Sequence, residues 1–162
     1  MIHRFHKFRI FHVLLSSVKN FLLCGCIGWC WEILVTALSR FADKNFDREL
    51  RGETSLWMFP IYGMGFLFLP LARLLKHQKF WLRGLVYTIL IFTTEYITGI
   101  WLTRRNLCPW NYSHARWNVH GVIRLDYAPG WFLLGLLYEN MLNSHARTLG
   151  TTINETVQAI GY

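Results

Sequence analysis

The chain has 162 residues, of which 53% are hydrophobic, 17% are aromatic and 16% are charged. A soluble domain carries about 25% charged residues, so this chain has too little polar surface to cover a soluble globule. Its 17 lysines and arginines exceed its nine aspartates and glutamates, and the net charge of +8 alone would suit a nucleic-acid-binding protein. The basic residues flank apolar segments, however, which favours a membrane surface as their partner.

The N-terminal part of the chain combines a basic segment with a long apolar one. Residues 1–19 include the run HRFHKFRIFH, and we expect this basic, aromatic segment to lie along anionic lipid headgroups. Residues 20–38 contain Glu32 as their only formal charge. Their length matches the about 20 residues with which a helix crosses about 30 Å of hydrocarbon, so they form the first predicted membrane span.

Three further apolar segments follow along the chain. The second predicted span is 56–75, the third is 84–102 with Glu95 as its only acidic residue, and the fourth is the shorter 127–142. Residues 143–162 form a predicted polar C-terminal tail. The sequence therefore predicts an all-α protein, a polytopic membrane helix bundle of four transmembrane helices at 20–142, with both termini on the same side.

The basic residues also predict an orientation. Two groups contain no acidic residue, one before the first span and one around the turn between the second and third spans: Arg4, Lys7, Arg9, Lys19, Arg73, Lys76, Lys79 and Arg83. The loops at the other end mix both signs, so the positive-inside rule predicts a cytoplasmic N-terminus, in the plasma (cytoplasmic) membrane if the source is bacterial. Once the helices are embedded, no basic face is left for nucleic acid.

Motifs for metals, cofactors and ATP are missing from the sequence. Cysteines at 24, 26, 30 and 108 do not have the spacing of a zinc site. No glycine-rich loop is followed by the lysine and serine or threonine of a phosphate-binding site. We therefore expect no metal, no cofactor and no catalytic residue in this chain. If ATP drives its function, another chain hydrolyses it.

The informative residues are the two carboxylates inside predicted spans, Glu32 and Glu95. A carboxylate at the bilayer centre costs about 2.5–3.5 kcal/mol on insertion scales, so it normally faces the bundle interior. Both lie slightly past the midpoint of their span, and the first and third spans run in the same direction, which predicts similar depths. Thr36 and Thr98 lie on the same helix faces. A packing role, with each carboxyl group bonded to a neighbouring helix, explains the two residues equally well.

Each carboxylate segment is followed by a polar loop with an arginine and then by a proline-bearing apolar segment. Arg51 precedes Pro60, and Arg124 precedes Pro129. This order is typical of helix-pair repeats that build a site at their interface, although two unrelated membrane hairpins would also produce it. It places the two arginines as candidate counter-ions near the outer mouth of a site.

The candidate residues fall into three groups. A polar intramembrane site is predicted from Glu32, Glu95, Trp29, Tyr62 and Tyr96, with Trp101 as a further aromatic neighbour. The predicted counter-ions or mouth residues are Arg51, Arg124, Trp110, Asn111 and Tyr112. Close helix packing is predicted at Gly28, Pro60, Gly63, Gly65 and Gly99, because small residues let backbones approach. Carboxylates beside aromatic faces suit a cation or a proton relay, whereas an interfacial aromatic belt is the alternative for the Trp and Tyr residues.

Five motifs occur in order between Phe21 and Leu142 and carry a family resemblance. They are GWCWE at 28–32, PIYGMG at 60–65, TEYITG at 94–99, CPWNYS at 108–113 and NVHGVIRLDYAPGWF at 118–132. In these motifs the chain resembles a family of small polytopic membrane proteins named for an ABC transporter permease (type IV), which is similar to the animal transmembrane protein 229 family. Family members have Trp-Asp-Tyr where this chain has Trp110, Asn111 and Tyr112, a difference that disfavours an enzyme relying on that aspartate.

Three functions remain open from the sequence. The first is a transporter permease subunit with a carboxylate-lined intramembrane site for a small, cationic substrate or for protons. The second is a non-catalytic membrane scaffold or regulatory subunit, and the third is an intramembrane enzyme that uses two carboxylates as acid and base. The expected partners are the lipid bilayer and either a second copy of the chain, a separate ATPase or another membrane subunit.

Overall fold

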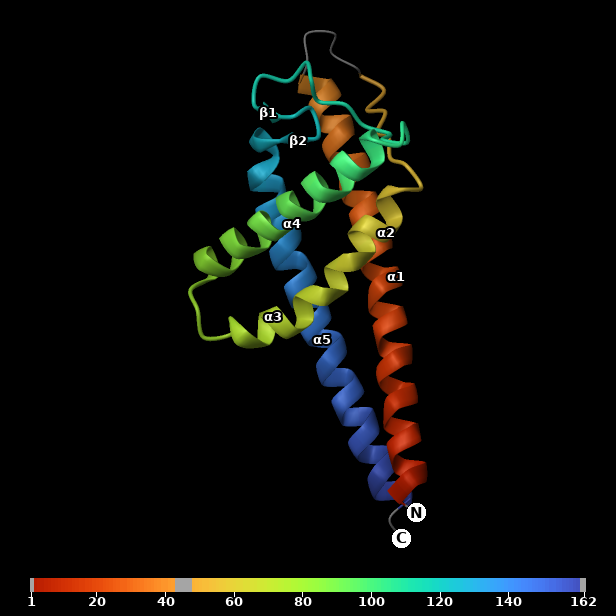
Figure 1. Cartoon of the computed structure of the whole chain (residues 1–162). Coiled ribbons are helices and arrows are strands. Elements are labelled where there is room, and N and C mark those ends of the chain that lie inside the picture. Colours follow the sequence, from red (N-terminus) through yellow and green to blue (C-terminus); the bar gives the residue numbers. More distant parts are fainter. Residues whose placement is uncertain (1, 43–47, 161–162) are drawn as a thin grey trace.

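The computed structural model describes the backbone of residues 2–42 and 48–160 and the side chains of residues 11–41 and 48–148. The chain is mostly helical (Figure 1), which confirms the predicted helical class. Its elements are α1 (Ile2–Ala42), α2 (Met58–Gly63), η1 (Met64–Leu67), α3 (Phe68–Leu74), α4 (Phe80–Thr103), β1 (Asn118–Val119), β2 (Ile123–Arg124), η2 (Leu125–Tyr127) and α5 (Ala128–Ile160).

The two longest helices, α1 and α5, run in opposite directions and bring both chain ends to the same end of the molecule (Figure 1). Neither helix is interrupted at the boundaries predicted between residues 19 and 20 and between residues 142 and 143. Helix α1 continues through the boundary between 1–19 and 20–38, and α5 continues from the predicted fourth span into 143–162. The physical reason is that polarity changes at these boundaries without a proline or a glycine that would end a helix.

The predicted second span, 56–75, is not one continuous helix. It consists of α2, the short 3-10 segment η1 and α3. Pro70 lies in the first turn of α3, where it provides no N–H for the carbonyl of Phe66 and its ring crowds that carbonyl. Gly63 and Gly65 lower the helix propensity just before it. The tighter 3-10 winding of Met64–Leu67 accommodates this break.

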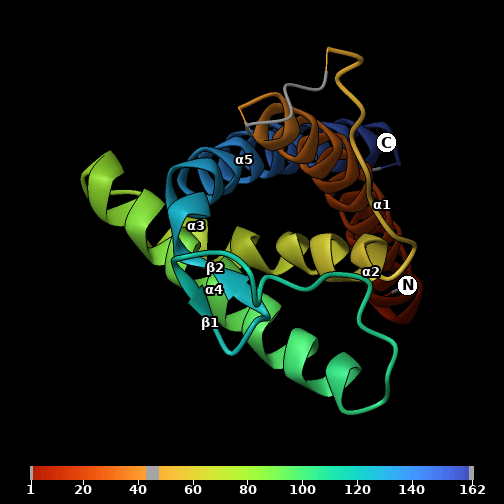
Figure 2. The ribbon, with the colours of Figure 1, turned by 90° about the horizontal axis from the view of Figure 1, so that it is seen from above.

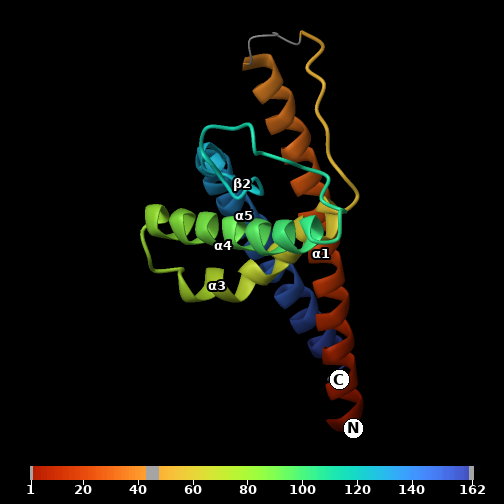
Figure 3. The same cartoon turned by 45° about the horizontal axis from the view of Figure 1, so that its top comes forward.

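Among the described residues, two helices are long and apolar enough to cross a membrane, Phe11–Phe41 and Phe80–Thr103. The apolar stretch Met58–Leu74 is shorter than these two helices. Helix α5 is not among the candidate membrane spans, and its C-terminal half is polar in sequence. Two predicted spans are thus present as helices of sufficient length, whereas a four-span topology stays a prediction. Figures 1 and 3 show α3 and α4 side by side and oblique to the long axis of α1.

The core lies between α1, the α2–α3 segment, α4 and α5, where Cys24, Tyr87, Leu134 and Leu142 are completely buried. Close packing depends on glycine at several helix contacts. A Cβ atom on Gly28 would overlap the ring of Tyr62. The backbone of α1 at Gly28 therefore lies in direct contact with this side chain of α2. Of the other predicted packing residues, Gly63 faces Phe21, Gly65 faces Tyr138, Gly99 faces Val122, and Pro60 lies exposed in the first turn of α2.

The long connection between α4 and α5 folds over the end of the molecule opposite to the chain termini (Figures 1 and 2). It contains an antiparallel two-stranded hairpin in which Asn118 pairs with Arg124 and Val119 with Ile123. His120 and Gly121 have φ values of 51° and 70°, and the N–H of Val122 donates to the carbonyl of Val119 at 3.1 Å. This tight turn requires the positive φ that glycine adopts without strain.

Candidate functional site

A cavity of about 310 Å³ lies between α2, η1, α4 and α5. Its wall is mainly apolar and also includes five side chains with polar atoms: Tyr62, Thr94, Glu95, Trp131 and Tyr138. Glu95 is 5% exposed and Trp131 is 3% exposed, so the carboxylate and the indole ring are buried in the protein. The cavity therefore holds an acidic group in apolar surroundings, the arrangement in which electrostatic interactions are strongest.

Three polar atoms on this wall have no hydrogen-bond partner among the described residues. They are Oε2 of Glu95, the hydroxyl group of Tyr62 and Nε1 of Trp131, and this indole nitrogen still lies close enough to the Glu95 carboxylate to interact with it. A buried polar atom without a partner costs about 1–3 kcal/mol, and proteins contain few of them. Two hydrogen-bond donors and one acceptor thus face a single cavity.

Glu32 of α1 lies close enough to interact electrostatically with Glu95, and Tyr62 interacts with both carboxylates. Unlike Glu95, Glu32 has a partner, because the hydroxyl group of Thr54 donates to its Oε2 at 2.5 Å. Thr54 belongs to the segment before α2, which follows the surface of α1. The two predicted carboxylates thus share one region of the molecule, with Glu32 bonded to Thr54 and Glu95 beside Trp131.

The segment that carries Thr54 is held to α1 by hydrogen bonds on both sides of Glu32. The indole N–H of Trp29 donates to the carbonyl of Ser55 at 3.0 Å. The N–H of Glu53 donates to the hydroxyl group of Thr36 at 2.9 Å. Trp29 therefore binds the segment before α2 through a hydrogen bond. Its ring packs edge-on against Phe59 of α2, and it does not line the Glu95 cavity.

A larger cavity of about 920 Å³ lies at the end of the molecule covered by the α4–α5 connection, and we call it the vestibule. Trp131 lines both the vestibule and the Glu95 cavity. Its ring meets Tyr62 on one side and Tyr127 on the other, with centroid distances of 6.4 and 6.0 Å. The ring of Trp131 thus forms a common wall between the two cavities.

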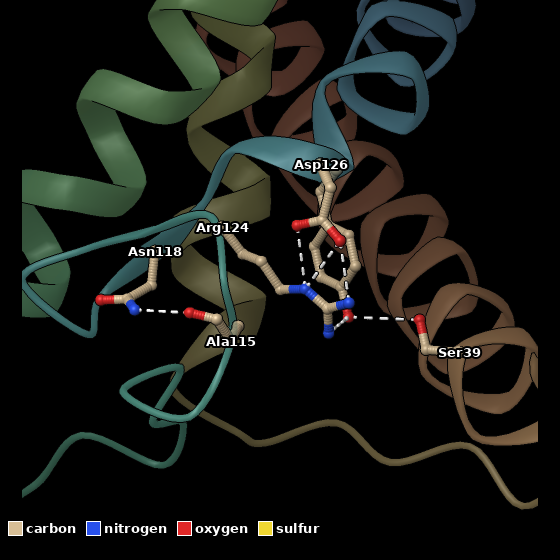
Figure 4. A network of polar contacts seen from close by, with 6 residues as sticks. Ser39, Ala115, Asn118, Arg124 and Asp126 are labelled. Carbon is tan, nitrogen blue, oxygen red and sulfur yellow. Dashed lines mark hydrogen bonds and ion pairs between the residues drawn. The ribbon is translucent and has the colours of Figure 1, made fainter. Parts of the chain in front are cut away.

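A polar network crosses the vestibule from α1 to the start of α5 (Figure 4). The guanidinium of Arg124 donates to both carboxylate oxygens of Asp126 at 2.8–3.0 Å, which raises the pKa of Arg124. It also donates to the hydroxyl group of Tyr127 at 3.2 Å, and that hydroxyl lies 3.2 Å from Oγ of Ser39. Arg124 is therefore paired inside the vestibule, and its nearest carboxylate is neither of the two glutamates.

Tyr112 of the connection reaches toward the same region. Its ring packs edge-on against Tyr127 at 5.9 Å, and it interacts electrostatically with Glu95 and Glu32. Burial raises the pKa of Tyr112 above its ordinary value, so the hydroxyl group stays protonated and can donate a hydrogen bond. A row of aromatic rings, Tyr112, Tyr127, Trp131 and Tyr62, thus extends from the vestibule to the Glu95 cavity.

Other predicted site residues have partners elsewhere. The Tyr96 hydroxyl lies 2.9 Å from Nδ1 of His120, on the hairpin side of α4. Arg51 forms an ion pair with Glu49 on the surface. The indole N–H of Trp110 donates to the carbonyl of Val122 at 2.9 Å.

Asn111 and Trp101 complete the predicted set. The side chain of Asn111 accepts a hydrogen bond from the N–H of Ser113 at 2.9 Å and lines the vestibule. Trp101 is exposed, with the guanidinium of Arg105 above its ring. The structure thus gathers Glu32, Glu95, Tyr62 and Tyr112 around one region and leaves the rest of the predicted aromatic set outside it.

Sequence reasoning did not select the two aromatic residues that join the cavities, Tyr127 and Trp131. A signal was present for Trp131, because it is three and seven residues before Leu134 and Tyr138 and so shares a face of α5 with them. Tyr127 ends η2, just before α5 begins. Thr54 was missed because it lies in a polar loop with no local pattern that points at Glu32.

A mostly helical chain with two apolar helices of membrane length and a buried carboxylate fits a membrane protein. Comparison with protein families makes this more specific. The family model described as putative ABC-transporter type IV matches residues 19–162, so the chain belongs to this family. No solved structure matches the chain.

Proposed function

We propose that this chain is a membrane-embedded transporter subunit that binds a small cation in the cavity at Glu95. The observation that carries this proposal is a buried carboxylate, Glu95, in a cavity lined by aromatic rings and by no basic residue among those described. The family membership supports a role in transport, and the cavity supports a site within this chain.

A cation is favoured over an anion or a neutral molecule by charge and by ring chemistry. None of the described residues on the cavity wall is basic, and the second carboxylate, Glu32, adds negative potential from the α1 side. The faces of aromatic rings attract cations, and the wall includes Tyr62, Phe68, Trp131 and Tyr138. A single carboxylate among aromatic rings suits an organic ammonium group, whose charge is spread over an apolar body.

The vestibule is the proposed approach to the site. The proposed path leads from the vestibule past the ring of Trp131, which borders both cavities, to Glu95. The sequence contains no phosphate-binding motif, so an ATP-driven transporter would require a separate ATPase chain. Association with other subunits and with the membrane is also what the family suggests.

Binding of benzyltrimethylammonium to the purified full chain in detergent tests the proposal, with tetramethylammonium as a smaller probe. We expect Glu95→Gln to weaken binding by at least tenfold while the protein stays folded, because the substitution removes charge and keeps the shape. Glu53→Gln is the matched control, since Glu53 is an exposed carboxylate paired with Arg40 at 2.7 Å. Equal binding by the wild type and Glu95→Gln would refute the cation site.

Uptake of the same probe into vesicles that contain the chain and its membrane partners tests transport itself. We expect uptake to be lost in Glu95→Gln and reduced in Glu32→Gln. A membrane scaffold predicts a different outcome, in which Glu95→Gln leaves uptake unchanged but releases a co-purifying subunit. An intramembrane enzyme predicts carboxylate-dependent turnover of a lipid or a peptide by the pure chain.

A further inference from the structure

A third cavity, of about 340 Å³, lies between the start of α4 and the middle of α5. Arg83 of α4 lines it, and α5 contributes Glu139, Asn140, Asn143, Ser144 and Arg147. It is separate from the site described above, because Arg83 and Glu95 are twelve residues apart on one helix, about 18 Å along its axis. This cavity is called the arginine cavity below.

An ion pair fixes one guanidinium at the wall of the arginine cavity. Nη1 of Arg83 lies 3.2 Å from Oε1 of Glu139, and these side chains are 26% and 7% exposed. Nε of Arg83 is buried and has no hydrogen-bond partner among the described residues. Glu139 therefore orients the guanidinium and leaves one of its N–H donors unused.

The α5 side of the arginine cavity is polar over two helical turns. Asn140, Ser144 and Arg147 follow one another at helical spacings of four and three residues, so they lie on one face, with Asn143 beside them. The amide groups can donate hydrogen bonds, and Arg147 contributes a second guanidinium. The charged residues among the described part of the wall are two arginines and one glutamate, and a planar guanidinium can bond two phosphate oxygens at once.

The outer surfaces of the same two helices are apolar. On α4, Trp81 and Leu85 are 65% and 52% exposed, and on α5, Leu133 and Leu137 are 57% and 43% exposed. Exposed apolar side chains beside a positively charged cavity provide contacts for acyl chains next to contacts for a headgroup. Tryptophan is enriched at the level of lipid headgroups, so a headgroup in the arginine cavity would agree with the exposed position of Trp81.

We propose that the arginine cavity binds the phosphate of an anionic phospholipid, with Arg83 and Arg147 as the charged ligands and Asn143 as an amide donor. This inference is independent of the cation site at Glu95. The same phosphate chemistry occurs in soluble phosphate esters, but only a lipid would also use the apolar surface of α4 and α5. A choline headgroup is disfavoured because its positive charge meets two arginines.

Native mass spectrometry of the full chain in detergent, with phosphatidylglycerol or phosphatidylcholine added, tests this proposal. We expect the wild type to retain phosphatidylglycerol at least tenfold better. Arg147→Gln is expected to abolish most of this preference, and Lys76→Gln, an exposed basic residue outside the cavity, is expected to keep it. A preference within twofold of the wild type in Arg147→Gln would overturn the proposal.

Two further measurements complete the test. Arg83→Gln alone would leave Glu139 buried without its ion-pair partner, so Arg83→Gln is combined with Glu139→Gln, which keeps two amides that can bond each other. The paired variant is expected to lose the preference for phosphatidylglycerol, and retention would overturn the role of Arg83. Glycerol 1-phosphate is expected not to displace the lipid, and displacement at equal concentration would identify a soluble phosphate ester as the occupant instead.

Discussion

Replacement of Glu95 by methionine separates a binding role of this carboxylate from a packing role. Oε2 of Glu95 is buried without a hydrogen-bond partner, which costs about 1–3 kcal/mol in the ligand-free protein. Methionine has a similar length, fills irregular apolar space and fits the apolar wall of the cavity. We therefore expect Glu95→Met to raise the free energy of unfolding by about 1–3 kcal/mol. At about 1.4 kcal/mol per factor of ten, this is about 5-fold to about 140-fold in the folding equilibrium.

The assay is reversible unfolding of the full chain in mixed micelles by increasing fractions of sodium dodecyl sulfate, followed by circular dichroism. Glu32→Met is the comparison, because Glu32 accepts a hydrogen bond from Thr54 at 2.5 Å. We expect Glu32→Met to lower the free energy of unfolding by about 1 kcal/mol through loss of that bond. The more stable Glu95→Met protein should no longer bind benzyltrimethylammonium, as expected where a functional group is retained at a cost in stability. A loss of stability above about 1 kcal/mol in Glu95→Met would refute the reasoning, since it would mean that packing depends on the carboxyl group.

Three further predictions concern packing, hydrogen bonding and pH. Gly28→Ala is expected to lower the free energy of unfolding by about 1–3 kcal/mol, because its Cβ would overlap the ring of Tyr62. Gly130→Ala, whose Cβ would meet its nearest neighbour at 3.7 Å, should be neutral or stabilising in the same unfolding assay, and equal losses in both variants would contradict the packing argument. Tyr138→Phe is expected to cost about 0.5–1.5 kcal/mol, because the hydroxyl group donates to a carbonyl of α1 at 2.8 Å, and an unchanged unfolding midpoint would exclude that contribution. Burial raises the pKa of Tyr112 above its ordinary value of 10, so the folded protein keeps a proton that the unfolded chain loses. The free energy of unfolding should therefore be independent of this group below about pH 10 and fall above it. Tyr112→Phe should reduce that alkaline fall, and an unchanged slope in unfolding measurements across this pH range would disprove it.

The helical character of the chain and its family were accessible from the sequence, because both depend on local patterns. Apolar runs of membrane length predicted the helices at 20–38 and 84–102, and ordered motifs predicted the family that the comparison shows. The shared neighbourhood of Glu32, Glu95 and Tyr62 also followed from one physical rule, that a carboxylate in an apolar helix faces the interior. No local pattern could show which of the two carboxylates has a hydrogen-bond partner.

The broken helix Met58–Leu74 shows where a local pattern was insufficient. The residues of 56–75 are apolar almost throughout. A continuous helix also requires that each backbone carbonyl accepts a hydrogen bond, and Pro70 has no N–H to donate. At the chain ends, α1 and α5 continue across the changes in polarity at residues 19/20 and 142/143. A helix continues through such a change as long as its backbone hydrogen bonds are complete.

The sequence by itself determined that this is an apolar, helical, transporter-like chain, since composition, apolar run lengths and motifs are properties of single segments. Only the tertiary structure decided that Trp131 borders both the vestibule and the Glu95 cavity, and that Arg83 pairs with Glu139 in the arginine cavity. Both features require α4 and α5 to meet, so they join residues that are 36 and 56 positions apart. The cost of a buried polar atom depends on the atoms that surround it, and those surroundings come from other segments of the chain.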